Sequence, residues 1–288
     1  LATQNFTTAT QTYNTAVGFQ AGNAVTTGIN NTFIGGLAGD ANTTADDNVA
    51  VGYLALSANT TGGNLTAVGK GALAANTTAN DNTGIGLRAL GAATTGASNT
   101  AVGRDAGLSV TTAGNNTLIG SIAGDALTTG NRNVAVGFNT LSDDTKGSRN
   151  VAIGDSALGD QNFTTATDSY NTAVGFAAGG TVSTGKENTL IGGLAGDALT
   201  DADYNIAIGH TALGLDTLGS RTVAIGHSAL DAQNFTTATN TYNVAVGHAA
   251  GSGVTTGIEN TLIGALAGDA FSDADYNVAI GSQALSSD

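Results

Sequence analysis

The stretch that decides the fold is Asn133-Val134-Ala135-Val136-Gly137, which returns 17 residues later as Asn150-Val151-Ala152-Ile153-Gly154. The glycine recurs in 16 copies along the 288 residues, and only the intervals Gly154 to Gly175 and Gly226 to Gly247 lengthen to 21. A fixed short period over the whole chain indicates one structural unit stacked on itself. We therefore expect functional residues to form columns along the stack.

The residue before the glycine is Val or Ile in all 16 copies. A β-branched side chain kept in every copy favours a packed, pleated surface. We therefore predict that this column faces the packed interior and forms the structural core. Its members include Val17, Ile34, Val51, Val68, Ile153, Ile191, Ile225 and Ile280.

Two further columns accompany the glycine. Asn stands four residues before it in 14 of 16 copies, and Thr or Ser stands eight residues after it in the 13 complete unstretched copies. Asn tolerates left-handed turn conformations, and stacked amides can hydrogen-bond from coil to coil. The glycines are expected to form turns, as at Gly18, Gly35, Gly52, Gly154 and Gly226.

Seventeen residues accommodate two short strands and two turns, one strand ending at the glycine and the other running through the Thr column. The predicted fold class is therefore all-β, a parallel β-roll or β-solenoid with 17-residue, two-strand coils. The absence of Pro fits this prediction, because Pro cannot donate a ladder hydrogen bond. Residues 1–288 are expected to form a single continuous segment of 16 coils, cut from a longer array.

A larger period of 72 residues, three coils of 17 and one of 21, starts at residues 99, 171 and 243. The longer coils carry insertions near residues 160–170 and 232–242, and residues 4–13 match the end of a further one. Because four extra residues must leave the ladder, we predict projecting loops that act as a hydrophobic clip between chains or as a receptor contact. Their aromatic residues are Phe163, Tyr170, Phe235 and Tyr242, with Phe6 and Tyr13 at the start.

One coil of this composition is too thin to stand alone. Ordering 17 residues costs about 25 kcal/mol at about 1.5 kcal/mol per residue, which requires burial of roughly 1000 Å² of apolar surface. One Val or Ile, one Ala and an occasional Leu do not supply that area in a single coil. We therefore predict a homotrimer with a buried axis lined by small and β-branched residues.

Net charge argues against a nucleic-acid partner, and hydropathy argues against a membrane-spanning segment. The formal charge is −14, which disfavours binding to a nucleic-acid backbone. No run of 18 apolar residues occurs, so no membrane insertion by this segment is expected. The lack of Cys excludes disulfides and thiol chemistry and fits an extracellular location.

The repeats Asn133–Gly137 and Asn150–Ala157 resemble those of YadA-like heads of trimeric autotransporter adhesins. The fuller form, Asn14–Gly22 followed by Thr26-Thr27-Gly28, is similar to repeats of phage tail fibres and of large bacterial surface proteins. This resemblance covers essentially the whole chain. It implies a left-handed, trimeric roll at a cell surface or in a virion tail fibre, and a partner such as a host-surface glycan or matrix protein.

Two sets of residues are candidate metal sites. His210, His227 and His248 share one column, where stacked imidazoles could bind a transition metal, although the same column elsewhere holds Phe19 and Asp155 and so favours a tolerant surface position. Acidic turns could hold Ca²⁺, but solvated turn charge is the favoured interpretation because the spacing of calcium-binding repeats is absent. These turns contain Asp46, Asp47, Asp201, Asp203, Asp273 and Asp275.

The Thr column raises ice binding as an alternative function, since regular hydroxyl arrays on flat solenoid faces suit it. No arrangement of Ser and His suggests a nucleophile with its base, and no cofactor motif occurs. The sequence therefore predicts a non-catalytic structural fibre segment, the shaft or head of a trimeric adhesin or tail fibre, that sets length and mediates attachment.

Overall fold

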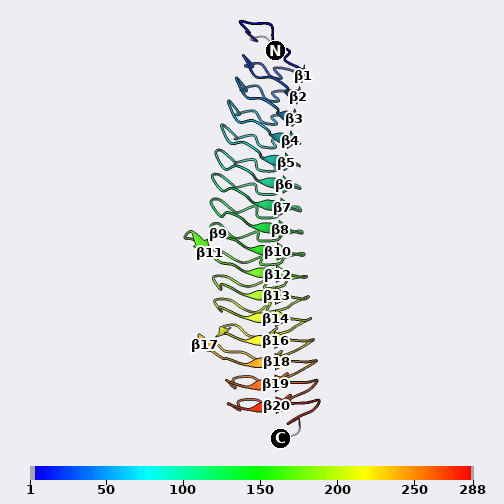
Figure 1. Ribbon diagram of the computed structural model, residues 1–288, viewed down its shortest axis with the longest axis vertical. Helices are drawn as coiled ribbons and strands as arrows, with labels where there is room; N and C mark the ends of the chain where they lie inside the picture. Colours follow the sequence, from blue (N-terminus) through cyan, green and yellow to red (C-terminus); the bar gives the residue numbers. More distant parts are fainter. Residues whose placement is uncertain (1–3, 287–288) are drawn as a thin grey trace. The chain divides into compact units, whose positions relative to one another are not determined.

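A computed structural model describes residues 4–286, and this part of the chain contains strands but no helix. It divides into two compact units, one ending at Phe138 and the other beginning at Asn139. Each coil contributes one three-residue strand to a parallel sheet (Figure 1). The prediction of an all-β parallel solenoid with 17-residue coils is confirmed, while the trimer and the left-handed sense stay predictions.

The first unit contains eight paired strands in chain order. They are β1 (Thr15–Val17), β2 (Thr32–Ile34), β3 (Val49–Val51), β4 (Thr66–Val68), β5 (Thr83–Ile85), β6 (Thr100–Val102), β7 (Thr117–Ile119) and β8 (Val134–Val136). Besides four two-residue strands, the described part of the second unit contains eight three-residue strands. They are β10 (Val151–Ile153), β12 (Thr172–Val174), β13 (Thr189–Ile191), β14 (Ile206–Ile208), β16 (Val223–Ile225), β18 (Val244–Val246), β19 (Thr261–Ile263) and β20 (Val278–Ile280).

The second strand expected in each coil is not regular. Around the Thr column the backbone bends, yet it still bonds from coil to coil, as where the Thr26 N–H donates to the Thr43 carbonyl at 2.9 Å. Among the described residues, two-residue strands form there only beside the insertions, as β9 (Gly147–Ser148) with β11 (Thr167–Asp168) and β15 (Gly219–Ser220) with β17 (Thr239–Asn240). Hydrogen bonds therefore join successive coils on both sides, but only one side of each coil is a regular strand.

The predicted core column lies on the wrong side of its strand. Val17, Ile34, Ile153, Ile191 and Ile280 are 37–67 % exposed, and Val51, Val68 and Ile225 are half-buried. Successive strand residues point to opposite faces, so the middle residue of each strand, such as Ala152, is the buried one. The Val/Ile column is therefore the outer face of the sheet, and the prediction that it forms the core of the chain is wrong.

The true core is built from side chains of complementary volume. Where the middle strand residue is large, as at Leu118, the residue four positions after the glycine is Gly124, and a Cβ there would lie 2.9 Å from Leu118 Cδ2. Where the middle residue is Ala, as at Ala67, that later position is often Leu, as at Leu73, which is fully buried. The alternation of Gly and Leu in the 72-residue pattern is thus a way of keeping the interior filled.

The recurring glycine is required by the close approach of the next coil. Gly52 has φ +137°, and a Cβ there would lie 2.6 Å from the carbonyl oxygen of Gly69. The other predicted turn glycines, Gly18, Gly35, Gly154 and Gly226, have φ between +128° and +137°. A side chain at this column would be strained by its backbone and would also block stacking, which confirms the predicted turns.

The Asn column forms the predicted ladder. Asn31 Nδ2 donates to the Ala45 carbonyl at 2.9 Å, and Asn31 Oδ1 accepts the Asn48 N–H at 3.0 Å. Both side chains are fully buried. Each amide therefore satisfies backbone groups that the bends leave without partners inside their own coil.

Candidate functional site

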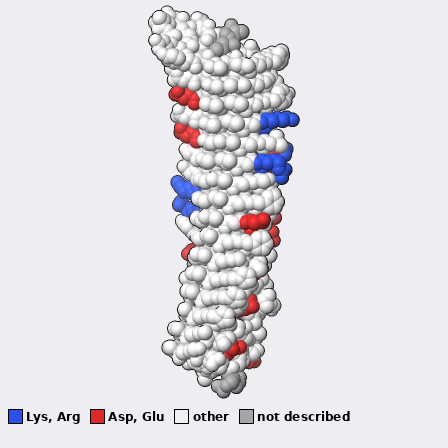
Figure 2. Space-filling model, turned by 90° about the vertical axis from the view of Figure 1, so that its right-hand side faces the viewer, with Lys and Arg blue, Asp and Glu red and all other residues white. Residues whose placement is uncertain are grey.

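The outer face of the sheet is the most regular surface of the described residues. In every three-residue strand the middle residue points inward, and the two flanking residues are Thr, Val or Ile. No charged residue of the three-residue strands belongs to this face, and in the upper part of the view the acidic and basic side chains lie along its margins (Figure 2). In each unit, the sequence therefore supplies a β-branched, uncharged surface eight strands long.

The two margins of this face are distinct because the strands are parallel. We call the margin where strands begin the entry edge; it holds residues such as Asp46 and Asp47, just before β3. The margin where strands end is the exit edge, with residues such as Lys70, just after β4. Every coil contributes to each edge once.

The three histidines lie on the exit edge of the second unit as a stack. The ring centroids of His210 and His227, and of His227 and His248, are 5.4 Å apart, with interplanar angles of 16° and 13°. Parallel rings on successive coils do not converge on one point. No group of three His, Cys, Asp or Glu suited to a metal ion occurs among the described residues.

The acidic turns considered for Ca²⁺ use their oxygens within the ladder. Asp46 Oδ1 accepts the Ile29 N–H at 2.7 Å, and Asp203 Oδ1 accepts the Lys186 N–H at 2.7 Å. Asp275 accepts the Ile258 N–H, Asp201 the Thr184 hydroxyl and Asp47 the Asn30 amide, at 2.7–2.9 Å. These carboxylates join successive coils and do not gather around a common centre.

The Thr column considered for ice binding is also occupied by the ladder. Thr26, Thr43 and Thr60 are half-buried, and each hydroxyl donates to the backbone carbonyl of the next coil at 2.9–3.1 Å. The same contact recurs at Thr200 and Thr255. This column is therefore a stabilising element of the stack and presents few free hydroxyl groups to a flat ligand.

The insertions leave the ladder as predicted, but only some of their aromatic residues are exposed. Ahead of the insertion the contacts keep an offset of 17 residues, as from Gln161 to Asp144, and beyond it the offset is 21, as from Ser169 to Ser148. Phe163 and Phe235 are only 6 % and 7 % exposed, so the prediction that they project is wrong. They face the interior of their own chain and anchor the exposed residues 164–166 and 236–238.

A buried polar cluster supports each insertion. Gln161 Nε2 donates to Asp144 Oδ2 at 2.7 Å, and Asn171 Nδ2 donates to Gln161 Oε1 at 2.8 Å. Burial raises the pKa of the Asp144 carboxyl, against the lowering effect of hydrogen bonds from Gly147 and Gln161. The second insertion repeats the arrangement, with Gln233 Nε2 at 2.6 Å from Asp216 Oδ2.

A column of tyrosines on the entry edge was not predicted from the sequence. Five of the six tyrosines stand five residues before the repeat glycine, with φ of 46–62° and exposures of 42–71 %. They are Tyr13, Tyr170, Tyr204, Tyr242 and Tyr276. Arginines pack over two of the rings, with Arg221 Cζ 4.5 Å from the Tyr204 centroid and Arg149 Cζ 5.6 Å from that of Tyr170. Alignment on the glycine would have revealed this column.

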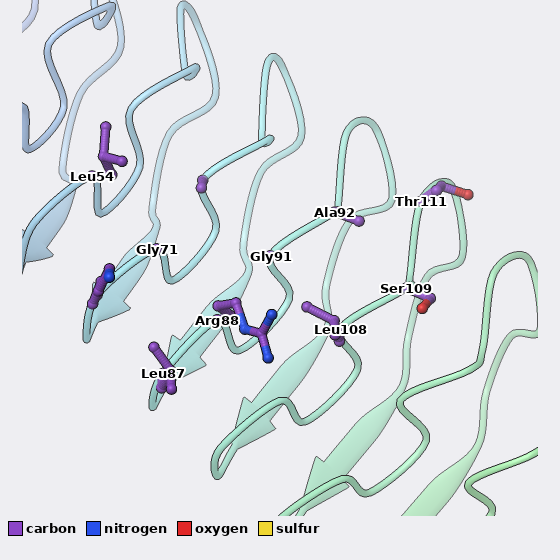
Figure 3. Close-up of a pocket in the computed structure, with 11 residues that line it drawn as sticks. Leu54, Gly71, Leu87, Arg88, Gly91, Ala92, Leu108, Ser109 and Thr111 are labelled. Carbon is purple, nitrogen blue, oxygen red and sulfur yellow. The ribbon is translucent and has the colours of Figure 1, made fainter.

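The first unit has an open groove of about 820 Å³ beside its exit edge (Figure 3). Leu54, Leu87 and Leu108 form apolar walls from different coils, and Lys70 and Arg88 add positive charge. The small residues Gly71 and Gly91 leave the space open. The lining contains no His, Asp, Glu or Cys, so it offers apolar contact and attraction for anions, without a paired nucleophile and base.

Within residues 4–286, no helix is long and apolar enough to cross a membrane. Comparisons with protein-family models, with curated proteins and with solved structures find no match for this chain.

Proposed function

We propose that the chain is a segment of a non-catalytic extracellular fibre that associates with copies of itself as a homotrimer. In this role the stack sets the length and stiffness of the shaft or head of a surface adhesin or a phage tail fibre. Attachment to a host-surface glycan or matrix protein belongs to the same proposal.

The observation that carries the proposal is the uncharged outer face of the sheet. Its Val/Ile column, which includes Ile34 and Ile191 at 39 % and 38 % exposure, remains partly open to water in a single chain. Covering that remainder would contribute roughly 0.5–1 kcal/mol per coil, summed over many coils. A contiguous apolar surface that runs over eight strands is typical of an interaction site. A second and a third copy of the chain would supply the matching surfaces.

The regularity of the coils supports a structural role. Successive strands pair with the same register, Val223 to Val244 and Val244 to Thr261, so each coil repeats the contacts of the one before it. Such a stack can lengthen by duplication without redesign of its interior. The 72-residue blocks of the sequence have the form that duplication would produce.

The decisive experiment compares two neighbouring residues of β10. Ile153→Asp places a charge on the outer face, so the chain should fold but its mass by light scattering should fall from trimer towards monomer. Ala152→Asp places a charge at a fully buried site and should unfold the surrounding coils. A wild-type chain that is monomeric at micromolar concentration, or an Ile153→Asp chain that stays trimeric, would overturn the proposal.

Two further measurements separate the roles of the fibre. Binding of the purified trimer to immobilised glycans or matrix proteins would favour a head, and no binding would favour a shaft. Thermal hysteresis is expected to be absent, since the hydroxyl groups of the Thr column are bonded within the stack. A clear hysteresis signal would instead support the ice-binding alternative.

A further inference from the structure

We propose that opposite charges on the two edges of the sheet in the first unit align neighbouring copies, parallel and within about one coil of the same level. This inference depends on the self-association proposed above and adds the orientation and register of the copies. The partner surface is a second copy of this chain.

The entry edge of the first unit carries three carboxylates, on the coils of β3 and β5, and a single basic residue, Arg132, further along before β8. Asp46 and Asp47 precede β3, and Asp81 precedes β5, two coils further on. All three side chains are exposed. Their recorded contacts are ladder hydrogen bonds from the preceding coil, and no ion pair within residues 4–286 involves them.

The exit edge is basic at overlapping levels, and the coil of β5 carries charges on both edges. Lys70, Arg88 and Arg104 follow β4, β5 and β6, which are successive coils. These are three of only eight basic residues in a chain of net charge −14. Arg88 and Arg104 share Asp105, at 2.8 Å and 3.2 Å, whose side chain is only 5 % exposed. Lys70 has no ion pair among the described residues.

The space-filling view shows the two edges together. In its upper part, red acidic side chains lie along the left margin of the uncharged face and blue basic ones along the right margin (Figure 2). The charges are therefore separated by the width of the sheet. Neither group can neutralise the other within one chain.

Parallel copies around an axis bring these edges into contact. In any cyclic assembly whose axis runs along the stack, the entry edge of one copy faces the exit edge of the next. Asp81 and Arg88 belong to the same coil, so copies at the same level place them opposite each other. A shift of one coil, about 4.8 Å, instead places Asp47 at the level of Lys70.

Other arrangements lose this attraction. A shift of three coils, about 14 Å, exceeds the screening length of roughly 8–10 Å at physiological salt. Antiparallel side-by-side copies bring acidic edge to acidic edge, which is repulsive. Charge complementarity of this kind selects orientation and register more than it adds affinity.

The test reverses each edge separately and then both. The exit-edge variant is Lys70→Glu with Arg104→Glu, which leaves Arg88 on Asp105. The entry-edge variant is Asp47→Lys with Asp81→Lys, and the combined variant carries all four substitutions and the original net charge. Trimer dissociation is measured by light scattering in low and in roughly 0.5 M salt, with a melting curve for each chain to show that it folds.

Each single-edge variant should associate about 10- to 100-fold more weakly than wild type in low salt, and the difference should shrink in high salt. The combined variant should recover the wild-type association. If overall charge alone matters, the entry-edge variant will associate more tightly, because it is less negative, and the inference is wrong. A stable trimer that neither variant weakens overturns the inference but leaves the proposed function standing; a monomeric wild type overturns both.

Cross-linking provides a second measurement that does not require charge reversal. The chain has no cysteine, so Lys70→Cys with Asp81→Cys adds one thiol to each edge. A short bis-maleimide should join parallel copies into covalent dimers and trimers. Asp81→Cys alone should give no trimer, and a double variant that also gives none in a stable assembly would contradict the proposed register.

Discussion

Replacement of Leu118 by Ala should remove a side chain that fills space in two coils. A Cβ at Gly107 would lie 2.7 Å from Leu118 Cδ1, and one at Gly124 would lie 2.9 Å from Cδ2, so the leucine occupies the volume over both glycines. Leu118 is fully buried. Losing it should cost about 3–5 kcal/mol, in the upper part of the range for Leu→Ala, because two glycines cannot collapse into the cavity.

A second substitution can return the lost volume from the other side of the coil. Gly124 has φ +56°, close to the +57° and +50° at which Leu56 and Leu73 occupy the equivalent position. Leu118→Ala with Gly124→Leu should therefore recover more than half of the lost stability. Gly124→Leu alone should overpack the coil and cost about 1–3 kcal/mol.

The assay for these three variants is thermal and denaturant unfolding combined with hydrogen exchange over residues 100–125. The local probe is needed because stacked repeats need not unfold as one unit. The expected signature is a favourable coupling between the two substitutions. A loss below about 1 kcal/mol for Leu118→Ala, or a double variant no more stable than the single one, would refute the complementary-volume model.

Three other outcomes are expected. Gly52→Ala should lower the free energy of unfolding by roughly 2–4 kcal/mol, because its φ of +137° and the Gly69 carbonyl leave no room for a Cβ. Gly36→Ala, whose Cβ would be 3.5 Å from Tyr53, should be nearly neutral, and equal losses in denaturant unfolding would show that the approach of the next coil is unimportant. Asp144 should make the fold more stable in mild acid: its folded pKa is raised above 3.8, so its contribution is complete below that pH and is lost as pH rises through the folded pKa. Melting temperature against pH should therefore be flatter for Asp144→Asn than for wild type, and identical profiles would contradict this. Phe163→Ala should cost about 3–5 kcal/mol and expose residues 163–167 to proteolysis, while Tyr170→Ala at an exposed site should change melting little; an unaltered melting curve for Phe163→Ala would show that the insertion is anchored elsewhere.

The Asp144 cluster also explains why the insertions stay ordered. The carboxylate accepts backbone N–H groups from Gly147 and Phe163, so it joins the coil before the insertion to the insertion itself. Removing the carboxylate oxygens would leave those N–H groups buried without a hydrogen-bond acceptor. The extra residues are thus held at both ends, and residues 164–166 remain exposed between them.

The period of the sequence determined the architecture of each coil. A glycine every 17 residues, an Asn four positions earlier and the absence of Pro are local requirements of turns and ladders, so they can be inferred without knowing what lies opposite. The turn at Gly52 and the Asn31 ladder could therefore be predicted residue by residue. The two glycine intervals of 21 residues instead of 17 located the insertions for the same reason.

Only the tertiary structure decided which side of the strand faces inward. A three-residue strand gives too few alternations to fix its orientation, and the invariant column at Ile153 suggested a core that Ala152 supplies instead. The inner position could vary because Leu118 or Leu73 fills the same space from different parts of the coil. Likewise, the sequence shows that Phe163 and Tyr170 are aromatic, but packing across coils determines that one is buried and the other exposed.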